Sequence, residues 1–194
     1  GPYFSGSHVL VMQWDSFIVD PQAWDASFLD YDYIGAPWPH RSQPVGNGGF
    51  SLRSRRLIDA LQDADIRKTQ PEDHVICLDY HDLLVARHGI RFAPVELARR
   101  FAFELTPPDG PVFGFHGFFN FHLALPDPEL LSYLAGVDRS VLFSMPARRL
   151  LKNLIDAGRH EPARRIIDVR AGGNLKQRLD AFKLRCRLAL RRLR

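Results

Sequence analysis

Residues 8–15 read His8-Val9-Leu10-Val11-Met12-Gln13-Trp14-Asp15. The first part of this stretch is a short apolar run rich in β-branched side chains, which is typical of a buried strand. The run ends at a tryptophan and an aspartate, so Asp15 is expected at the end of the strand. Open α/β sheets bind their ligands at strand ends. The stretch therefore predicts an α/β fold with Asp15 in a ligand site.

The sequence that follows alternates short strands with helical segments. A turn, Val45-Gly46-Asn47-Gly48-Gly49, lies between strands expected at 32–36 and 50–53. Its glycines indicate a place where the backbone passes close to another group. Helices are expected over 54–64 and over 71–88, and the second opens with Pro71 and two acids, as a helix N-terminus should. Further short strands are expected near 91–93, 101–104 and 112–115.

Each candidate site residue, taken singly, also has an ordinary structural explanation. Asp15 suits a turn, Glu72 and Asp73 suit the positive end of a helix, and His116 suits a packed histidine. The glycine turn fits neither the dinucleotide-binding fingerprint nor the spacing of a phosphate-binding P-loop. The order of these elements along the chain is more informative than any one of them.

Four segments in this order resemble the GT-A glycosyltransferase superfamily. Its members share a strand ending in a DxD-type motif, a glycine-rich loop, an xED motif opening a helix, and a C-terminal metal-binding histidine. The matching segments are Gln13-Trp14-Asp15, Val45 to Arg53, Pro71-Glu72-Asp73-His74 and Gly114-Phe115-His116-Gly117. A closer resemblance is to a family of bacterial and fungal proteins regarded as glycosyltransferases. It rests on the glycine turn and on Tyr31-Asp32-Tyr33-Ile34-Gly35-Ala36-Pro37-Trp38. The resemblance covers residues 8–120.

The resemblance implies a GT-A-like (Rossmann-like) mixed sheet flanked by helices and a nucleotide-sugar donor, most simply UDP-linked. It also implies a divalent cation, Mn²⁺ or Mg²⁺, because such an ion stabilises the charged leaving group. Asp15 and His116 would bind this metal, since manganese accepts oxygen ligands and imidazole. Donor contacts would come from Gln13, Asp15, Gly46, Asn47, Gly48 and Gly49. Asp73 would be the general base of an inverting transfer, and Glu72 would orient the acceptor.

The chain departs from the superfamily pattern at two places. Gln13 replaces the first acid of the DxD motif, which implies that metal binding depends on Asp15, His116, phosphate and water. The superfamily also has nucleotide-binding strands and helices before this motif, whereas only seven residues precede His8 here. The N-terminal nucleotide-binding part is therefore expected to be missing from the sequence shown.

Charge separates the chain into a predicted GT-A-like portion, 1–145, and a basic helical extension, 146–194. Residues 147–194 hold 15 Lys and Arg against 4 Asp and Glu, whereas 1–146 are acidic overall. Helices are expected over 146–157, 160–170 and 174–193. In the last of these an apolar stripe, with basic residues over the rest of the helix, consists of Leu175, Leu179, Phe182, Cys186, Leu190 and Leu193. The stripe suits packing on the globule or on a second copy, or an anionic inner membrane leaflet. Nucleic acid is the least favoured partner, because no reading motif is present.

The favoured function is transfer of a sugar to a surface or capsular glycan or to a lipid-linked acceptor. A metal-dependent hydrolase or nucleotidyltransferase remains an alternative, although the sequence has no HExxH motif. A non-catalytic adaptor that presents the helical tail is another. Cys77 and Cys186 lie far apart, which suits a reducing compartment. Without a spanning run or a secretory signal, the sequence predicts a cytoplasmic protein, peripheral at the inner membrane if the tail binds lipid.

Overall fold

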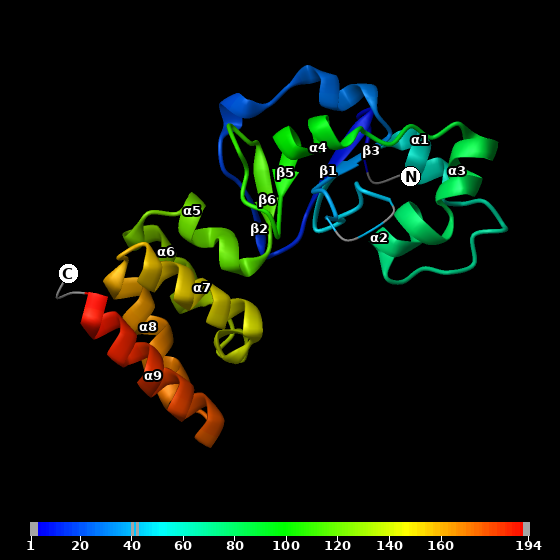
Figure 1. Ribbon diagram of the computed structural model, residues 1–194. Coiled ribbons are helices and arrows are strands. Elements are labelled where there is room, and N and C mark those ends of the chain that lie inside the picture. Colours follow the sequence, from blue (N-terminus) through cyan, green and yellow to red (C-terminus); the bar gives the residue numbers. More distant parts are fainter. Residues whose placement is uncertain (1–3, 40, 42, 192–194) are drawn as a thin grey trace. The chain divides into compact units, whose positions relative to one another are not determined.

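The chain is a mixed α/β protein built as two compact units, residues 1–116 and 117–194. The structure, a computed structural model, describes residues 4–39, 41 and 43–191. Both sheets belong to the first unit, and the second unit is helical in its described part (Figure 1).

The first sheet has the order β1-β4-β3, from β1 (His8–Met12), β4 (Phe50–Ser54) and β3 (Tyr33–Gly35). Both pairings are antiparallel, and Met12 faces Phe50. The next backbone amide, that of Gln13, donates to the carbonyl of Gly49 at 2.8 Å. The end of β1 and the glycine turn are therefore joined directly, which brings two of the predicted site segments together.

The second sheet has the order β2-β6-β5, from β2 (Ser16–Ile18), β6 (Gly114–His116) and β5 (Ala102–Phe103). β2 runs antiparallel to β6 with Ser16 opposite His116, and β5 runs parallel to β6. Because Asp15 immediately precedes β2, this register places it beside His116 despite their distance along the chain.

The helices of the first unit are α1 (Arg55–Ala60), α2 (Glu72–His74), α3 (His81–His88) and α4 (Val95–Phe101). The prediction of one helix over 71–88 was wrong, because a π-helical turn at Val75–Asp79 follows α2 and Tyr80 leaves the helical conformation at φ −122°. α4 was not expected, and the predicted strand near 91–93 is a single bridge from Tyr33 to Phe92. Two apolar clusters, around Phe50 and around Leu57, hold these elements on the sheets.

The second unit contains α5 (Phe121–Ala124), α6 (Asp127–Gly136), α7 (Met145–Asp156), α8 (His160–Ala171) and α9 (Leu175–Arg191). The predicted extension begins at 146, whereas this unit begins at Gly117. α6 belongs to it because its buried Leu130 and Leu134 pack with the later helices, a relation that charge alone does not reveal. Among the described residues no helix combines the length and apolar character needed to cross a bilayer.

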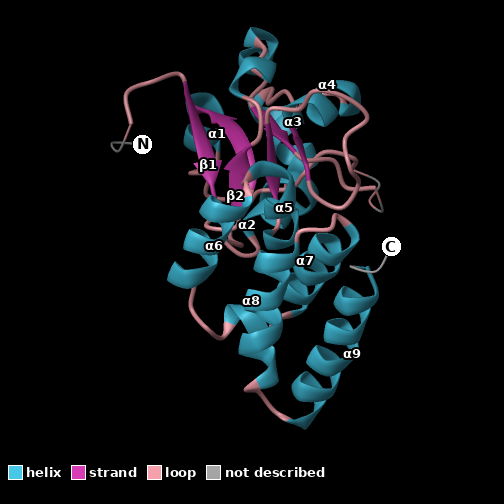
Figure 2. Cartoon of the chain, turned by 90° about the vertical axis from the view of Figure 1, so that its left-hand side faces the viewer, coloured by secondary structure: helices cyan, strands magenta, loops and turns pink. Residues whose placement is uncertain are grey.

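α9 has two apolar faces instead of one. It lies beside α8 (Figure 2), and its buried residues are Ala181, Leu184 and Leu188. The predicted stripe is a different set, and its members are exposed: Leu175 by 71%, Leu179 by 53%, Phe182 by 67% and Leu190 by 65%, with Cys186 also exposed. Leu193, Arg192 and Arg194 lie outside the described residues. The prediction that basic residues occupy the rest of α9 was therefore wrong on the packed face.

Candidate functional site

Asp15 and His116 form the centre of the site. Asp15 lies three residues beyond the end of β1 and immediately before β2. His116 is the last residue of β6. Carboxylate oxygen Oδ1 of Asp15 lies 3.2 Å from Nε2 of His116, and both side chains are largely buried, with 17% and 16% exposed. The two predicted metal ligands are thus in direct contact.

The other nitrogen of the His116 ring, Nδ1, lies near Glu104 and Asn47. Glu104 Oε1 lies 3.6 Å from Nδ1, and the Asn47 amide nitrogen lies 3.1 Å from the same atom. Asn47 also donates to Glu104 Oε2 at 3.0 Å. Glu104 was not predicted as a site residue. Its position at the end of the strand expected over 101–104 was the available signal, by the same reasoning that selected Asp15.

The two carboxylates determine the charge of His116. Burial alone lowers the pKa of an imidazole, but the hydrogen bonds and charges of Asp15 and Glu104 outweigh it and raise the pKa of His116 to about 9. In the metal-free protein the ring is therefore an imidazolium between two carboxylates at neutral pH. Any cation that binds Nε2 must displace a proton from it.

This raised pKa predicts a pH-dependent stability. Because the folded-state pKa exceeds the ordinary value of 6.5, the stabilisation is complete below about pH 6.5 and is lost as the pH rises through about 9. The loss is expected to reach about 3 kcal/mol in the free energy of unfolding. Urea unfolding at pH 6 and pH 9.5 measures it, and His116→Gln should lack this step. The same pH dependence in both proteins would contradict the assignment.

The glycine turn packs against site side chains. A Cβ atom on Gly48 would lie 2.9 Å from the Cβ of Asp73, and one on Gly49 would lie 2.3 Å from the His116 ring. Both contacts are closer than a real side chain tolerates. The sequence prediction assigned the missing side chains to the approach of a donor or an acceptor. In the structure, Asp73 and His116 occupy that space.

Asp73 and Glu72 have different surroundings. Glu72 forms an ion pair with Arg53 of β4, whose side chain is only 6% exposed. Asp73 Oδ1 accepts from the backbone amide of His74, the next residue of α2, at 2.9 Å. Arg53 thus holds Glu72 at the helix start, while the Cβ of Asp73 lies against Gly48 of the glycine turn.

Asp73 and His116 line one pocket of about 480 Å³, named here the His116 pocket, whereas Asp15 and Glu72 are not among its lining residues. Three of its residues are predicted site residues, namely Asn47, Asp73 and His116. Trp38, His74 and Glu104 also line it. Gln13, by contrast, contributes its backbone to Gly49 while its residue is exposed, and it does not line this pocket.

A family model described as a protein of unknown function, DUF5672, matches residues 3–116. The chain belongs to the DUF5672 family. The match covers more than half of the chain and ends at His116, where the first compact unit ends. Searches of curated proteins and of solved structures returned no match.

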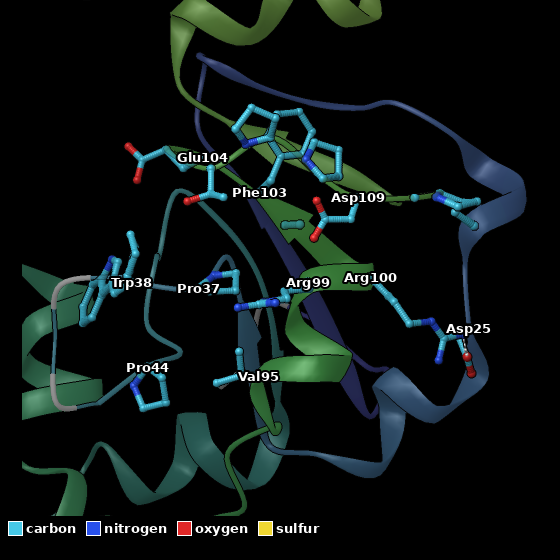
Figure 3. Close-up of a pocket in the computed structure, with 18 of the residues that line it drawn as sticks. Asp25, Pro37, Trp38, Pro44, Val95, Arg99, Arg100, Phe103, Glu104 and Asp109 are labelled. Atoms are coloured by element: carbon cyan, nitrogen blue, oxygen red, sulfur yellow. Dashed lines mark hydrogen bonds and ion pairs between the residues drawn. The ribbon is translucent and has the colours of Figure 1, made fainter.

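A second pocket of the DUF5672 unit, the Trp24 pocket, has a volume of about 810 Å³. Trp38 and Glu104 line it as well as the His116 pocket, so the two adjoin. In Figure 3, Trp38 and Glu104 lie at one end and the Arg100–Asp25 ion pair lies at the other. Its lining combines charged side chains, among them Arg99, Arg100 and Asp109, with the rings of Trp24, Pro37, Trp38, Pro44, Phe103 and Pro107.

The aromatic residues of the sequence divide between this pocket and the core. Trp24 and Trp38 line the Trp24 pocket, where their ring faces can contact a ligand. The cluster Phe113, Phe115, Phe118, Phe119 and Phe121, by contrast, is buried. Its members contribute to packing, the more ordinary of the two roles considered from the sequence.

The donor atoms of the DUF5672 unit fit a divalent cation in part. Two neighbouring ligands of an octahedral ion, each about 2.1 Å from the metal, lie about 3 Å apart, close to the 3.2 Å between Asp15 and His116. Glu104 at Nδ1 suits the outer carboxylate that commonly orients a metal-binding histidine. No three His, Cys, Asp or Glu side chains of the described residues converge on one metal position. Phosphate and water would have to supply the other ligands.

Proposed function

We propose that this chain carries the catalytic part of a GT-A-type glycosyltransferase, which moves a sugar from a nucleotide donor to a glycan or lipid-linked acceptor. One observation carries the proposal: three segments far apart in sequence place Asp15 against His116, and His116 with Asp73 around one pocket. The ion pair accounts for the burial of Asp15 with His116, whereas the placement of Asp73 at the same pocket adds the carboxylate that a transfer reaction needs.

Asp15 and His116 are the proposed ligands of Mn²⁺ or Mg²⁺. When bound, the ion supplies positive charge to the diphosphate leaving group as the sugar bond breaks. Glu104 holds the imidazole by its Nδ1 side and is itself held by the Asn47 amide, which leaves Nε2 directed at Asp15. The ring therefore needs little reorganisation to exchange its proton for a metal.

Asp73 is the proposed general base. A base must reach the acceptor hydroxyl, and Asp73 lines the His116 pocket. Its Oδ1 accepts from the His74 amide, so its other carboxylate oxygen, Oδ2, is the proposed proton acceptor. Glu72 is held by Arg53 and does not line this pocket. Its proposed role is therefore to position the start of α2, and through it Asp73, rather than to remove the proton.

The Trp24 pocket is the proposed acceptor site. Sugar rings present apolar faces that stack on aromatic side chains, and Trp24, Trp38 and Phe103 offer such faces beside Glu104. The shared wall at Trp38 and Glu104 joins this pocket to the His116 pocket. An acceptor bound there would reach the proposed base at its inner end.

Metal and donor binding provide the test. Mn²⁺ should bind the full chain, as followed by the loss of its free electron paramagnetic resonance signal, and should increase the affinity for UDP-sugars. Asp15→Asn and His116→Gln should each weaken Mn²⁺ binding by about tenfold or more. Asp109→Asn, which removes a carboxylate from the Trp24 pocket but not from the metal pair, is the matched control.

Other outcomes separate the alternatives. UDP-sugar cleavage at full rate without any acceptor would favour a hydrolase. Failure of the full chain to bind Mn²⁺ or any nucleotide sugar would favour the adaptor. Equal losses of Mn²⁺ binding in Asp109→Asn and Asp15→Asn would contradict the assigned ligands.

A further inference from the structure

The outer face of α9 is an apolar stripe that no described part of the second unit covers. Its members, which we call the outer stripe, are Leu175, Leu179, Phe182, Cys186 and Leu190. At about 100° per residue these positions fall on one line along the helix, opposite the buried Ala181, Leu184 and Leu188. Packing of the second unit therefore accounts for one face of α9 and leaves the other unexplained.

Cations flank the outer stripe on both sides. The same helical geometry places Lys176, Lys183 and Arg187 about a quarter-turn to one side. Arg178 and Arg185 lie about a quarter-turn to the other side, and all five residues are exposed. Arg185 and Arg187 also form exposed ion pairs, with Asp168 and Asp156 respectively. Exposed ion pairs are weak, so both arginines can exchange these partners for a lipid phosphate.

The acidic residue of α9 does not face the stripe. Asp180 bonds to Arg148 Nη2 at 2.6 Å and to Arg170 Nη2 at 3.2 Å. Arg170 is only 4% exposed, and it also donates to the carbonyl of Leu142 at 2.9 Å. These bonds fix α9 on α7 and α8, so the outer stripe belongs to a rigid surface.

A hollow of about 700 Å³ adjoins the stripe near the start of α9. Leu175 and Leu179 form part of its lining, together with Lys176 and Lys183. Met145, which is 72% exposed, extends the apolar lining beyond the helix. The surface thus combines apolar side chains at its centre with cations at its edge.

We infer that the outer stripe binds the surface of an anionic lipid bilayer, with α9 lying in the plane of the membrane. Apolar side chains enter the boundary between headgroups and acyl chains, and flanking Lys and Arg side chains reach the phosphates beside them. Cations on both sides, with no acid between them, complement an anionic leaflet. The inference does not depend on the function proposed for the DUF5672 unit.

The charges disfavour the other occupants. A second copy docked through the same stripe would place rows of Lys and Arg against one another, whereas helix pairs of this kind place opposite charges at their flanks. Nucleic acid would contact the cations but would leave the central apolar side chains without a partner. An anionic lipid surface uses both features of this face.

Sedimentation of the full chain with vesicles tests the inference. Binding should be strong with equal amounts of phosphatidylcholine and phosphatidylglycerol, and weak with phosphatidylcholine alone. Leu179→Asp and Phe182→Asp should each lower the partition coefficient by about tenfold or more, because each replaces an inserted apolar group. Both positions are exposed, so circular dichroism should remain unchanged.

A charge pair provides the matched control. Lys176→Glu with Lys183→Glu should lower binding by about tenfold or more. Arg164→Glu with Arg165→Glu makes the same change in net charge on exposed residues of α8 and should have a much smaller effect. Equal losses in the two double variants would overturn the inference, because the effect would then follow net charge alone.

Two further results would also overturn it. One is a change of oligomeric state in Phe182→Asp, measured by analytical ultracentrifugation, together with unchanged vesicle binding. The other is tight binding of duplex DNA that survives Leu179→Asp and exceeds binding to the anionic vesicles at the same salt concentration.

Discussion

Replacing Asp73 with Asn should lower the rate of the proposed sugar transfer by a factor of about 10² to 10⁴, while donor affinity stays nearly constant. A positioned general base contributes rate enhancement of this size, and Asn cannot accept the proton. Donor affinity depends instead on metal and nucleotide contacts. Initial rates of sugar transfer, with a separate donor titration, measure the two quantities.

Two other substitutions complete this experiment. Asp82→Asn alters an acid in the first turn of α3, outside the His116 pocket, and should leave the rate unchanged. Glu72→Gln weakens the ion pair with Arg53, so it should lower stability along with activity. Full activity in Asp73→Asn with an inactive but stable Glu72→Gln would move the base to Glu72.

Replacing Arg53 with Met should lower the free energy of unfolding by about 3 kcal/mol. Its buried guanidinium pairs with Glu72, donates to Ser51 Oγ at 3.0 Å and to the Gly48 carbonyl at 3.3 Å, and lies over the Tyr33 ring. Burial lowers the pKa of Arg53, because it removes water from the charged guanidinium, and these partners replace that solvation. Removing one member of such a network leaves the others without partners.

Urea unfolding of Arg53→Met beside Arg67→Met measures this effect. Arg67 is an exposed arginine of the same unit, and its loss should change stability by less than about 0.5 kcal/mol. Similar values for the two variants would mean that the Arg53 network contributes little. The Gly48 contact also predicts that Arg53→Met weakens Mn²⁺ binding, because the turn lies between Arg53 and the site.

Local sequence patterns predicted several of the strands near the site, whereas β2 (Ser16–Ile18), which follows Asp15 and pairs with β6, was not predicted. The apolar run at 8–12, the segment around Tyr33 and the stretch after the glycine turn all form strands, because each has a clear alternation or apolar character bounded by turn residues. The order of motifs also selected Asp15, Asp73 and His116, which the structure gathers in one region. Their roles in metal binding and catalysis stay predictions.

Local sequence patterns did not predict the contact of Glu104 with His116 or the break in the helix at Tyr80, and the physical reasons differ. Glu104 reaches His116 only through the pairing of β5 with β6, which is a long-range contact that periodicity does not encode. The 71–88 segment has helical spacing throughout, so its π-helical turn depends on how Ile76 and Cys77 pack in the core. In α9 the predicted apolar stripe exists, but it is exposed. The buried face consists of the shorter set Ala181, Leu184 and Leu188.

The close contacts of Gly48 and Gly49 have a consequence for how the site keeps its shape. Asp73 packs against Gly48 and His116 packs against Gly49. The proposed base and the proposed metal ligand therefore contact two consecutive residues of the backbone. Rotamers of exposed side chains change on a nanosecond scale. The backbone of this turn is held instead by bonds from the Gln13 amide to the Gly49 carbonyl and from Ser51 and Arg53 to the Gly48 carbonyl. The distance between the Cβ of Asp73 and the His116 ring is therefore set by the backbone of the glycine turn, and side-chain motion changes it little.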